Sequence, residues 1–117
     1  MVNMELKKNK SILIIGASGS IGSKTALRLS KDGYNIGLHF VSNIKKVKKL
    51  CNAINKITSA KIIQSDLKDY NSCKNLIGRF TKEFKNPYGL AFCGGNVRWK
   101  NWNTLDANDW QKTFFEH

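Results

Sequence analysis

The chain has 117 residues, of which 41% are hydrophobic, and it contains a single proline. This length allows one domain, the composition excludes a disordered chain, and no apolar run is long enough to cross a bilayer. The formal net charge of +12 raises nucleic acid as a partner, but its lysines are spread along the chain, so we rank nucleic-acid binding last among the possible functions.

The amino terminus and the cysteines both predict a cytoplasmic protein. Several lysines precede only four aliphatic residues, Ile12–Ile15, which are too few for the apolar core of a signal peptide. Cys51, Cys73 and Cys93 are odd in number and include no C-x-x-C pair. We therefore expect three reduced, mostly buried thiols, with neither a disulfide framework nor a zinc site.

The first half of the chain predicts two strands, each followed by a helix. Ile12–Ile15 is a short aliphatic run that ends at a glycine, which is typical of a buried strand. Residues 22–31 follow with a helical pattern, and Asn35–Phe40 predicts a second strand. Ser42 or Asn43 is placed to cap the next helix, in which the lysines of residues 45–49 form a solvated face.

The second half repeats this alternation. Residues 60–65 predict a third strand, and Asp69 or Asn71 starts a helix that we expect to end at Asn86-Pro87. Leu90–Cys93 predicts a fourth strand, and Asp106 caps a last helix. The third helix carries an apolar stripe at helical spacing, made of Cys73, Leu76, Ile77, Phe80 and Phe84.

Strands that alternate with helices predict a parallel sheet with right-handed crossovers. The expected architecture is α/β, a Rossmann-like doubly wound sheet of four strands and about four helices. We expect residues 1–117 to form a single domain with the fourth strand as an open edge of the sheet.

Three glycines three residues apart follow the first strand: Gly16, Gly19 and Gly22. A tight turn from a parallel strand into a helix directs free N–H groups and the positive end of the helix dipole at an anion, and glycine allows a phosphate to come close. The context of strand, turn and helix favours a dinucleotide site. A P-loop is disfavoured, because Ser23 separates Gly22 from Lys24.

The end of the second strand predicts which dinucleotide binds. An NAD site usually has an acidic residue there, which binds the ribose hydroxyls. This chain instead has Val41, Ser42 and Asn43, followed by Lys45 and Lys46. Such surroundings suit a 2′-phosphate, so we expect NADP(H) to be preferred over NAD(H).

These segments together resemble the short-chain dehydrogenase/reductase family, especially its 3-oxoacyl-carrier-protein-reductase-like branch. The similar segments are IIGASGSIG at 14–22, LHFVSN at 38–43, SDLKD at 65–69, AFCGG at 91–95 and DANDW at 106–110. The resemblance implies a cofactor site in which the glycine turn holds the pyrophosphate, the end of the second strand the 2′-phosphate, the third strand the adenine, and the fourth strand the ribose. Its residues would be Gly16, Ser18, Gly19, Ser20, Ile21, Gly22, Val41, Ser42, Asn43, Asp66, Leu67, Phe92, Cys93 and Gly94.

The resemblance also implies what this chain lacks. The family's reaction needs a serine and a Tyr-x-x-x-Lys pair that follow later in its sequences. Tyr70 and Lys74 have this spacing, but they open a helix in the cofactor-binding half, so we interpret the match as chance. His117 falls near the position of the family's helical asparagine, and we assign it no catalytic role. We expect no catalytic residue and no metal ligand, in a chain truncated before the catalytic half.

The resulting hypothesis is an NAD(P)-dependent oxidoreductase, here its cofactor-binding half. The complete enzyme would transfer hydride between NADP(H) and a small carbonyl or alcohol substrate. A non-catalytic NADP(H)-binding or regulatory module is the alternative, and a basic nucleic-acid-binding domain is the third possibility. A homo-oligomer or a completing chain is a possible partner, and we expect no membrane association.

Overall fold

The computed structural model describes residues 9–94, 102–104, 106–109 and 111. Within these residues, four strands and three long helices alternate in the predicted order. They are β1 (Ser11–Ile15), α2 (Ser20–Lys31), β2 (Asn35–Phe40), α3 (Ile44–Ile54), β3 (Ala60–Gln64), α4 (Tyr70–Glu83) and β4 (Pro87–Phe92), followed by a short 3-10 helix at Trp102–Thr104.

All the strand pairs are parallel, and the strand order is β3-β2-β1-β4. The predicted doubly wound parallel sheet is therefore confirmed. In this sheet β1 lies between β2 and β4, while β4 is an edge strand, as expected. The chain reverses its direction of travel across the sheet between β1 and β4, which makes this pair the topological switch point of the fold.

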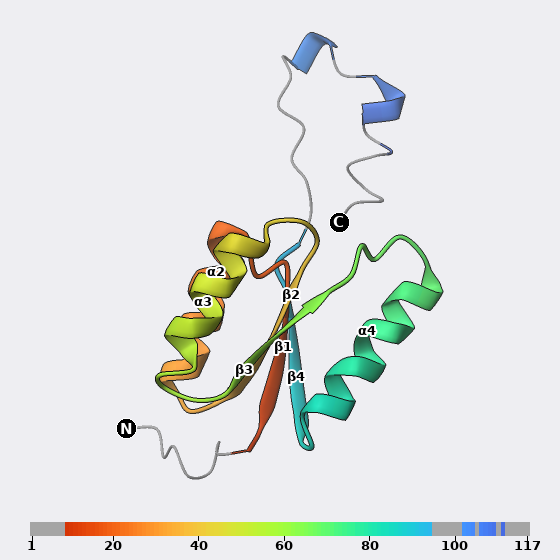
Figure 1. Ribbon diagram of the computed structural model, residues 1–117. Coiled ribbons are helices and arrows are strands. Elements are labelled where there is room, and N and C mark those ends of the chain that lie inside the picture. The colour runs from red at the N-terminus through yellow and green to blue at the C-terminus, as the bar shows by residue number, and fades with distance from the viewer. Residues whose placement is uncertain (1–8, 95–101, 105, 110, 112–117) are drawn as a thin grey trace.

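Helices cover both faces of the sheet. Figure 1 shows α2 and α3 together on one side and α4 on the other. The alternation of side chains along β1 explains this arrangement, because Ile12 and Ile14 join the core beneath α2 and α3, and Leu13 and Ile15 join the core beneath α4. The central strand is thus buried on both faces, as its continuous aliphatic sequence predicts.

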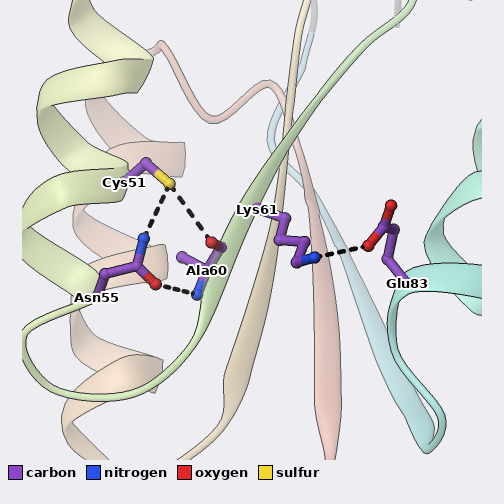
Figure 2. A network of polar contacts seen from close by, with 5 residues as sticks. All are labelled: Cys51, Asn55, Ala60, Lys61 and Glu83. Carbon is purple, nitrogen blue, oxygen red and sulfur yellow. Dashed lines mark hydrogen bonds and ion pairs between the residues drawn. The ribbon is translucent and has the colours of Figure 1, made fainter.

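Polar contacts tie β3 to the helices on both faces of the sheet (Figure 2). The Asn55 side chain accepts a hydrogen bond from Ala60 N at 2.8 Å and donates to Cys51 Sγ at 3.4 Å. Lys61 of β3 forms a 2.8 Å ion pair with Glu83 near the end of α4. The Asn55 contacts hold the turn between α3 and β3. The ion pair links β3, the second edge strand, to α4 on the other face of the sheet.

The carboxyl-terminal part of α4 and the start of β4 differ from the sequence prediction. The helix ends at Glu83, and Pro87, which we expected to act only as a helix breaker, is the first residue of β4. A proline is tolerated there because the first residue of an edge strand need not donate to the sheet.

Two residues of the predicted α4 stripe do not face the core. Leu76, Phe80 and Phe84 are buried, whereas Cys73 and Ile77 are exposed. The stripe is therefore narrower than its sequence spacing indicates. All three cysteines are free, as expected, but only Cys51 is buried, so the expectation of mostly buried thiols is wrong.

The predicted cap of the last helix is present. Asp106 Oδ1 accepts from Asp109 N at 2.9 Å, and residues 107–109 are helical. Gly95, Trp110, the side chain of Trp102 and His117 lie outside what the structure describes. Among the described residues, no helix is long and apolar enough to cross a membrane.

Candidate cofactor site

The turn that follows β1 requires glycine at its first position. Gly16 has φ +80°, in the left-handed region that side chains disfavour. A Cβ atom there would also lie 2.7 Å from Gly94 Cα, because the end of β4 packs directly against the turn. The backbone bond from Cys93 N to Ile15 O, at 2.8 Å, holds the two segments together. Gly16, Cys93 and Gly94 are therefore brought together at the switch point.

The start of α2 packs against the same turn. A Cβ atom on Gly22 would overlap the carbonyl oxygen of Gly16, so this glycine permits the close approach of helix and turn. Gly19 is the N-cap residue, and no side chain caps the helix. The first turn of α2 has no acidic residue, and Gly19, Ser20 and Ile21 are exposed. This end of the helix therefore offers N–H groups and a positive dipole end to an anion.

The end of β2 leads into the capped start of α3. Asn43 Oδ1 accepts a hydrogen bond from Lys46 N at 3.3 Å, which confirms Asn43 rather than Ser42 as the cap. Val41 and Ser42 are exposed beside it. Because Asn43 Oδ1 already serves the helix, the amide nitrogen of Asn43 and the hydroxyl of Ser42 are the groups that this loop offers to a ligand.

The end of β3 has an unusual backbone. Leu67 has φ +55°, a left-handed conformation that is uncommon for a residue with a bulky side chain, and it packs against the core beneath α4. Asp66 is exposed, and its Oδ1 accepts from Lys68 N at 3.1 Å. This turn leaves the other carboxylate oxygen of Asp66 at the surface. Gln64 Nε2 donates to Val41 O at 2.9 Å and so ties the β3 end to the β2 end.

Fourteen residues were predicted to bind cofactor, and they all follow or end one of the four strands. Because the strands are parallel, these residues share the carboxyl edge of the sheet. Ser18 is half-buried within the glycine turn, and Phe92 ends β4 with a largely exposed side chain. The carboxyl edge at a topological switch point is where open α/β sheets bind their ligands.

His39 is a site residue that the sequence argument treats only as a strand residue. Its side chain is 1% exposed, and its ring lies between two predicted parts of the site. Nδ1 accepts from Gly16 N at 3.1 Å, and Nε2 lies 2.8 Å from Ser65 O. Burial lowers the pKa of His39, and the contact with the Ser65 carbonyl opposes that shift. The available signal was an ionisable residue one position before the end of a buried strand.

The described residues contain no group of three or more His, Cys, Asp or Glu side chains that could hold a metal ion. The groups that converge at the carboxyl edge are instead backbone N–H groups, hydroxyls, one amide and one carboxylate. This is a donor-rich set that suits phosphates and ribose hydroxyls.

A sequence profile of the family described as short chain dehydrogenase matches residues 10–115. The chain belongs to the short-chain dehydrogenase family. The predicted resemblance to the 3-oxoacyl-carrier-protein reductases is also confirmed, because proteins of that name are among its relatives. One from Aggregatibacter actinomycetemcomitans is 26% identical over 105 residues, which are 89% of this chain and 43% of the relative. One from Staphylococcus aureus is 30% identical over 80 residues, which are 68% of this chain and 32% of the relative.

Solved structures of short-chain dehydrogenases share the fold. A short-chain dehydrogenase from Burkholderia cenocepacia in complex with NADP superposes with a TM-score of 0.84 at 23% identity, covering 94% of this chain and 45% of that one. A second dehydrogenase from the same species, with bound NADP, gives a TM-score of 0.83 at 18% identity and covers 94% of this chain and 43% of that one. The chain thus spans less than half the length of these relatives.

Proposed function

We propose that this chain is the NADP(H)-binding part of a short-chain dehydrogenase that transfers hydride to or from a carbonyl or alcohol carbon. The observation that carries the proposal is the turn between β1 and α2. It combines a left-handed Gly16 packed on Gly94, a Gly22 in contact with Gly16, and an uncapped helix start without acidic residues. A side chain at Gly16 or Gly22 would fill the space in which backbone segments come into contact. A pyrophosphate site requires this close approach of the backbone.

In this proposal the exposed N–H groups at the start of α2 bind the pyrophosphate. Ser42 and the amide nitrogen of Asn43 bind the 2′-phosphate, and the exposed Asp66 carboxylate accepts from the adenine amino group. Phe92, Cys93 and Gly94 line the ribose side. The bound cofactor supplies the hydride, and the protein positions it.

The preference for NADP(H) rests on the absence of an acid at the end of β2 and on exposed Lys45 and Lys46 in the first turn of α3. Two NADP complexes among the similar structures support a dinucleotide site and leave the choice between NADP and NAD to experiment.

The proposal extends to the catalytic residues. Proton transfer to or from the substrate oxygen would be performed by residues outside this sequence, which is less than half as long as the relatives above. The match of Tyr70 and Lys74 to the catalytic spacing gains no support from the structure, because Tyr70 is 77% exposed in the first turn of α4.

Calorimetric titration of the chain with NADPH and with NADH tests the proposal. We expect NADPH to bind more tightly, and Ser42→Asp to reverse the preference. The new carboxylate would repel the 2′-phosphate and accept from ribose hydroxyls, which weakens NADPH binding by roughly tenfold or more. Ser59→Asp is the matched control, because it changes the net charge equally. Ser59 is exposed just before β3, at the amino ends of the strands and away from the proposed site.

Equal effects of the two substitutions would show that only net charge matters, and absence of NADPH binding would contradict the assignment of the site. NADPH binding by this chain, together with a downstream coding sequence that lacks Tyr-x-x-x-Lys, would favour the non-catalytic NADP(H)-binding module instead.

A further inference from the structure

His39, near the end of β2, contacts the segments that follow β1 and β3. Its carbonyl oxygen accepts from Ala17 N at 2.8 Å, its Nδ1 faces Gly16 N, and its Nε2 faces Ser65 O. The ring therefore lies between the glycine turn after β1 and the segment that leads from β3 to Asp66. These two segments carry the proposed pyrophosphate and adenine contacts.

The partners of the ring determine its protonation state. A backbone N–H can only donate, so Nδ1 must be the bare, accepting nitrogen. A carbonyl oxygen can only accept, so Nε2 must carry the proton. One tautomer of the neutral ring satisfies both contacts, and the protonated ring satisfies only one, because it would direct an N–H at the N–H of Gly16. The lowered pKa caused by burial agrees with a neutral ring.

We propose that His39, as the neutral Nε2–H tautomer, is a positioning residue that sets the shape of the glycine turn and couples it to the adenine-binding loop. The inference rests on the proposed function of the turn as the pyrophosphate seat. By accepting from Gly16 N, the ring withdraws this N–H from the ligand and leaves phosphate binding to the N–H groups at the start of α2. Through Ser65 the same ring fixes the backbone that immediately precedes Asp66.

Two substitutions separate the contacts of the ring. In His39→Asn the side-chain oxygen can occupy the place of Nδ1 and accept from Gly16 N, but the side chain is too short to reach Ser65 O. In His39→Gln the amide nitrogen can occupy the place of Nε2 and donate to Ser65 O, but Gly16 N loses its acceptor. A partly buried N–H that loses its acceptor is costly, so we expect the Gln variant to be the more damaged of the two at the turn.

The first measurement is amide hydrogen exchange at Gly16, followed by NMR. We expect exchange in His39→Gln to be at least about tenfold faster than in the unchanged chain, and exchange in His39→Asn to remain within about threefold of it. Ala17 is the internal control, because its N–H bonds to the main-chain carbonyl of residue 39, which every variant retains. Equal exchange at Gly16 in both variants would overturn the inference.

The second measurement is the ¹⁵N NMR signature of the ring in the unchanged chain, which requires no variant to fold. We expect the Nε2–H tautomer at neutral pH. A protonated ring or the Nδ1–H tautomer would overturn the inference.

NADPH titration then tests the link to the cofactor. We expect the dissociation constant to rise roughly tenfold in His39→Gln and much less in His39→Asn, the variant that restores the acceptor. If the unchanged chain binds no NADPH, the proposed function fails, while amide exchange and the ring tautomer still decide the role of His39 at the turn. If NADPH binds equally to both variants, the coupling of His39 to the site is refuted.

Discussion

A single buried histidine also makes the stability of the chain dependent on pH. Burial lowers the pKa of His39 in the folded protein below its ordinary value of about 6.5, which the unfolded chain retains. Below pH 6.5 the unfolded state therefore binds more protons than the folded state. The stabilisation by the neutral ring is complete above pH 6.5 and is lost as the pH falls from there toward the folded pKa, at up to about 1.4 kcal/mol per pH unit.

Urea unfolding between pH 8 and pH 5.5 measures this effect. We expect the contribution of His39 to the free energy of unfolding to be constant above pH 6.5 and to decrease below it in the unchanged chain. In His39→Asn the free energy of unfolding should vary much less, because the titrating ring is gone and the lost contact with Ser65 O does not depend on pH. Within the part of the chain that the structure describes, the ring bonds to backbone groups of Gly16 and Ser65 and to no titrating side chain. Parallel curves for the two chains would refute the lowered pKa.

At the scale of elements, the close contact between α2 and the glycine turn gives a second stability prediction. Gly22→Ala places a methyl group into the carbonyl oxygen of Gly16, and the helix must move to relieve the overlap. We expect it to lower the free energy of unfolding by about 1–3 kcal/mol, although alanine favours helix more than glycine does.

Gly78→Ala is the matched control for this substitution. It lies in the exposed interior of α4, and a Cβ atom there meets nothing within 4 Å. Only helix propensity acts at this position, so we expect stabilisation by about 0.5–1 kcal/mol. Chemical denaturation of both variants gives the two signs, and stabilisation by both would mean that α2 does not press on the turn.

The elements themselves were largely predictable, because their signals are local. The bounds of β2 agree with the sequence prediction, since Gly33 ends the preceding helical pattern and Ser42 and Asn43 follow the strand closely. The choice between Asp69 and Asn71 as the start of α4 falls to Asp69, because its side chain and that of Ser72 cap each other's backbone N–H groups. The start of β4 was missed because Pro87 signals a break in a helix and also tolerates the first position of an edge strand.

The site was predictable where one segment determines it and unpredictable where two segments meet. The glycine turn is recognisable from the spacing of Gly16, Gly19 and Gly22 alone. The bond between Gly16 and His39 joins residues 23 positions apart, and it depends on the parallel register of β1 and β2. Sequence spacing carries no information on that register, so the ring between the two turns becomes visible only in the fold.

At the scale of the molecule, the sheet is covered unevenly. Leu90 and Phe92 of β4 pair with Leu13 and Ile15 of β1, so they lie on the face of the sheet against which α4 packs. Both β4 side chains are more than half exposed, at 54% and 56%. An edge strand with exposed apolar side chains favours association, either with a second copy or with another polypeptide.

The net charge opposes this association between identical copies. A formal charge of +12 repels a second copy at low ionic strength, whereas at 0.15 M salt the screening length falls to about 8 Å. We therefore expect sedimentation velocity to show self-association that increases with protein concentration and with salt.

Leu90→Lys should reduce this self-association at every salt concentration, because it removes apolar surface at the edge. Ile57→Lys, which alters an exposed residue just after α3, should reduce it only at low salt, where added charge acts over long distances. If Leu90→Lys leaves association unchanged while lowering the free energy of unfolding, the apolar edge is covered within the chain itself, and β4 is not the surface through which copies associate.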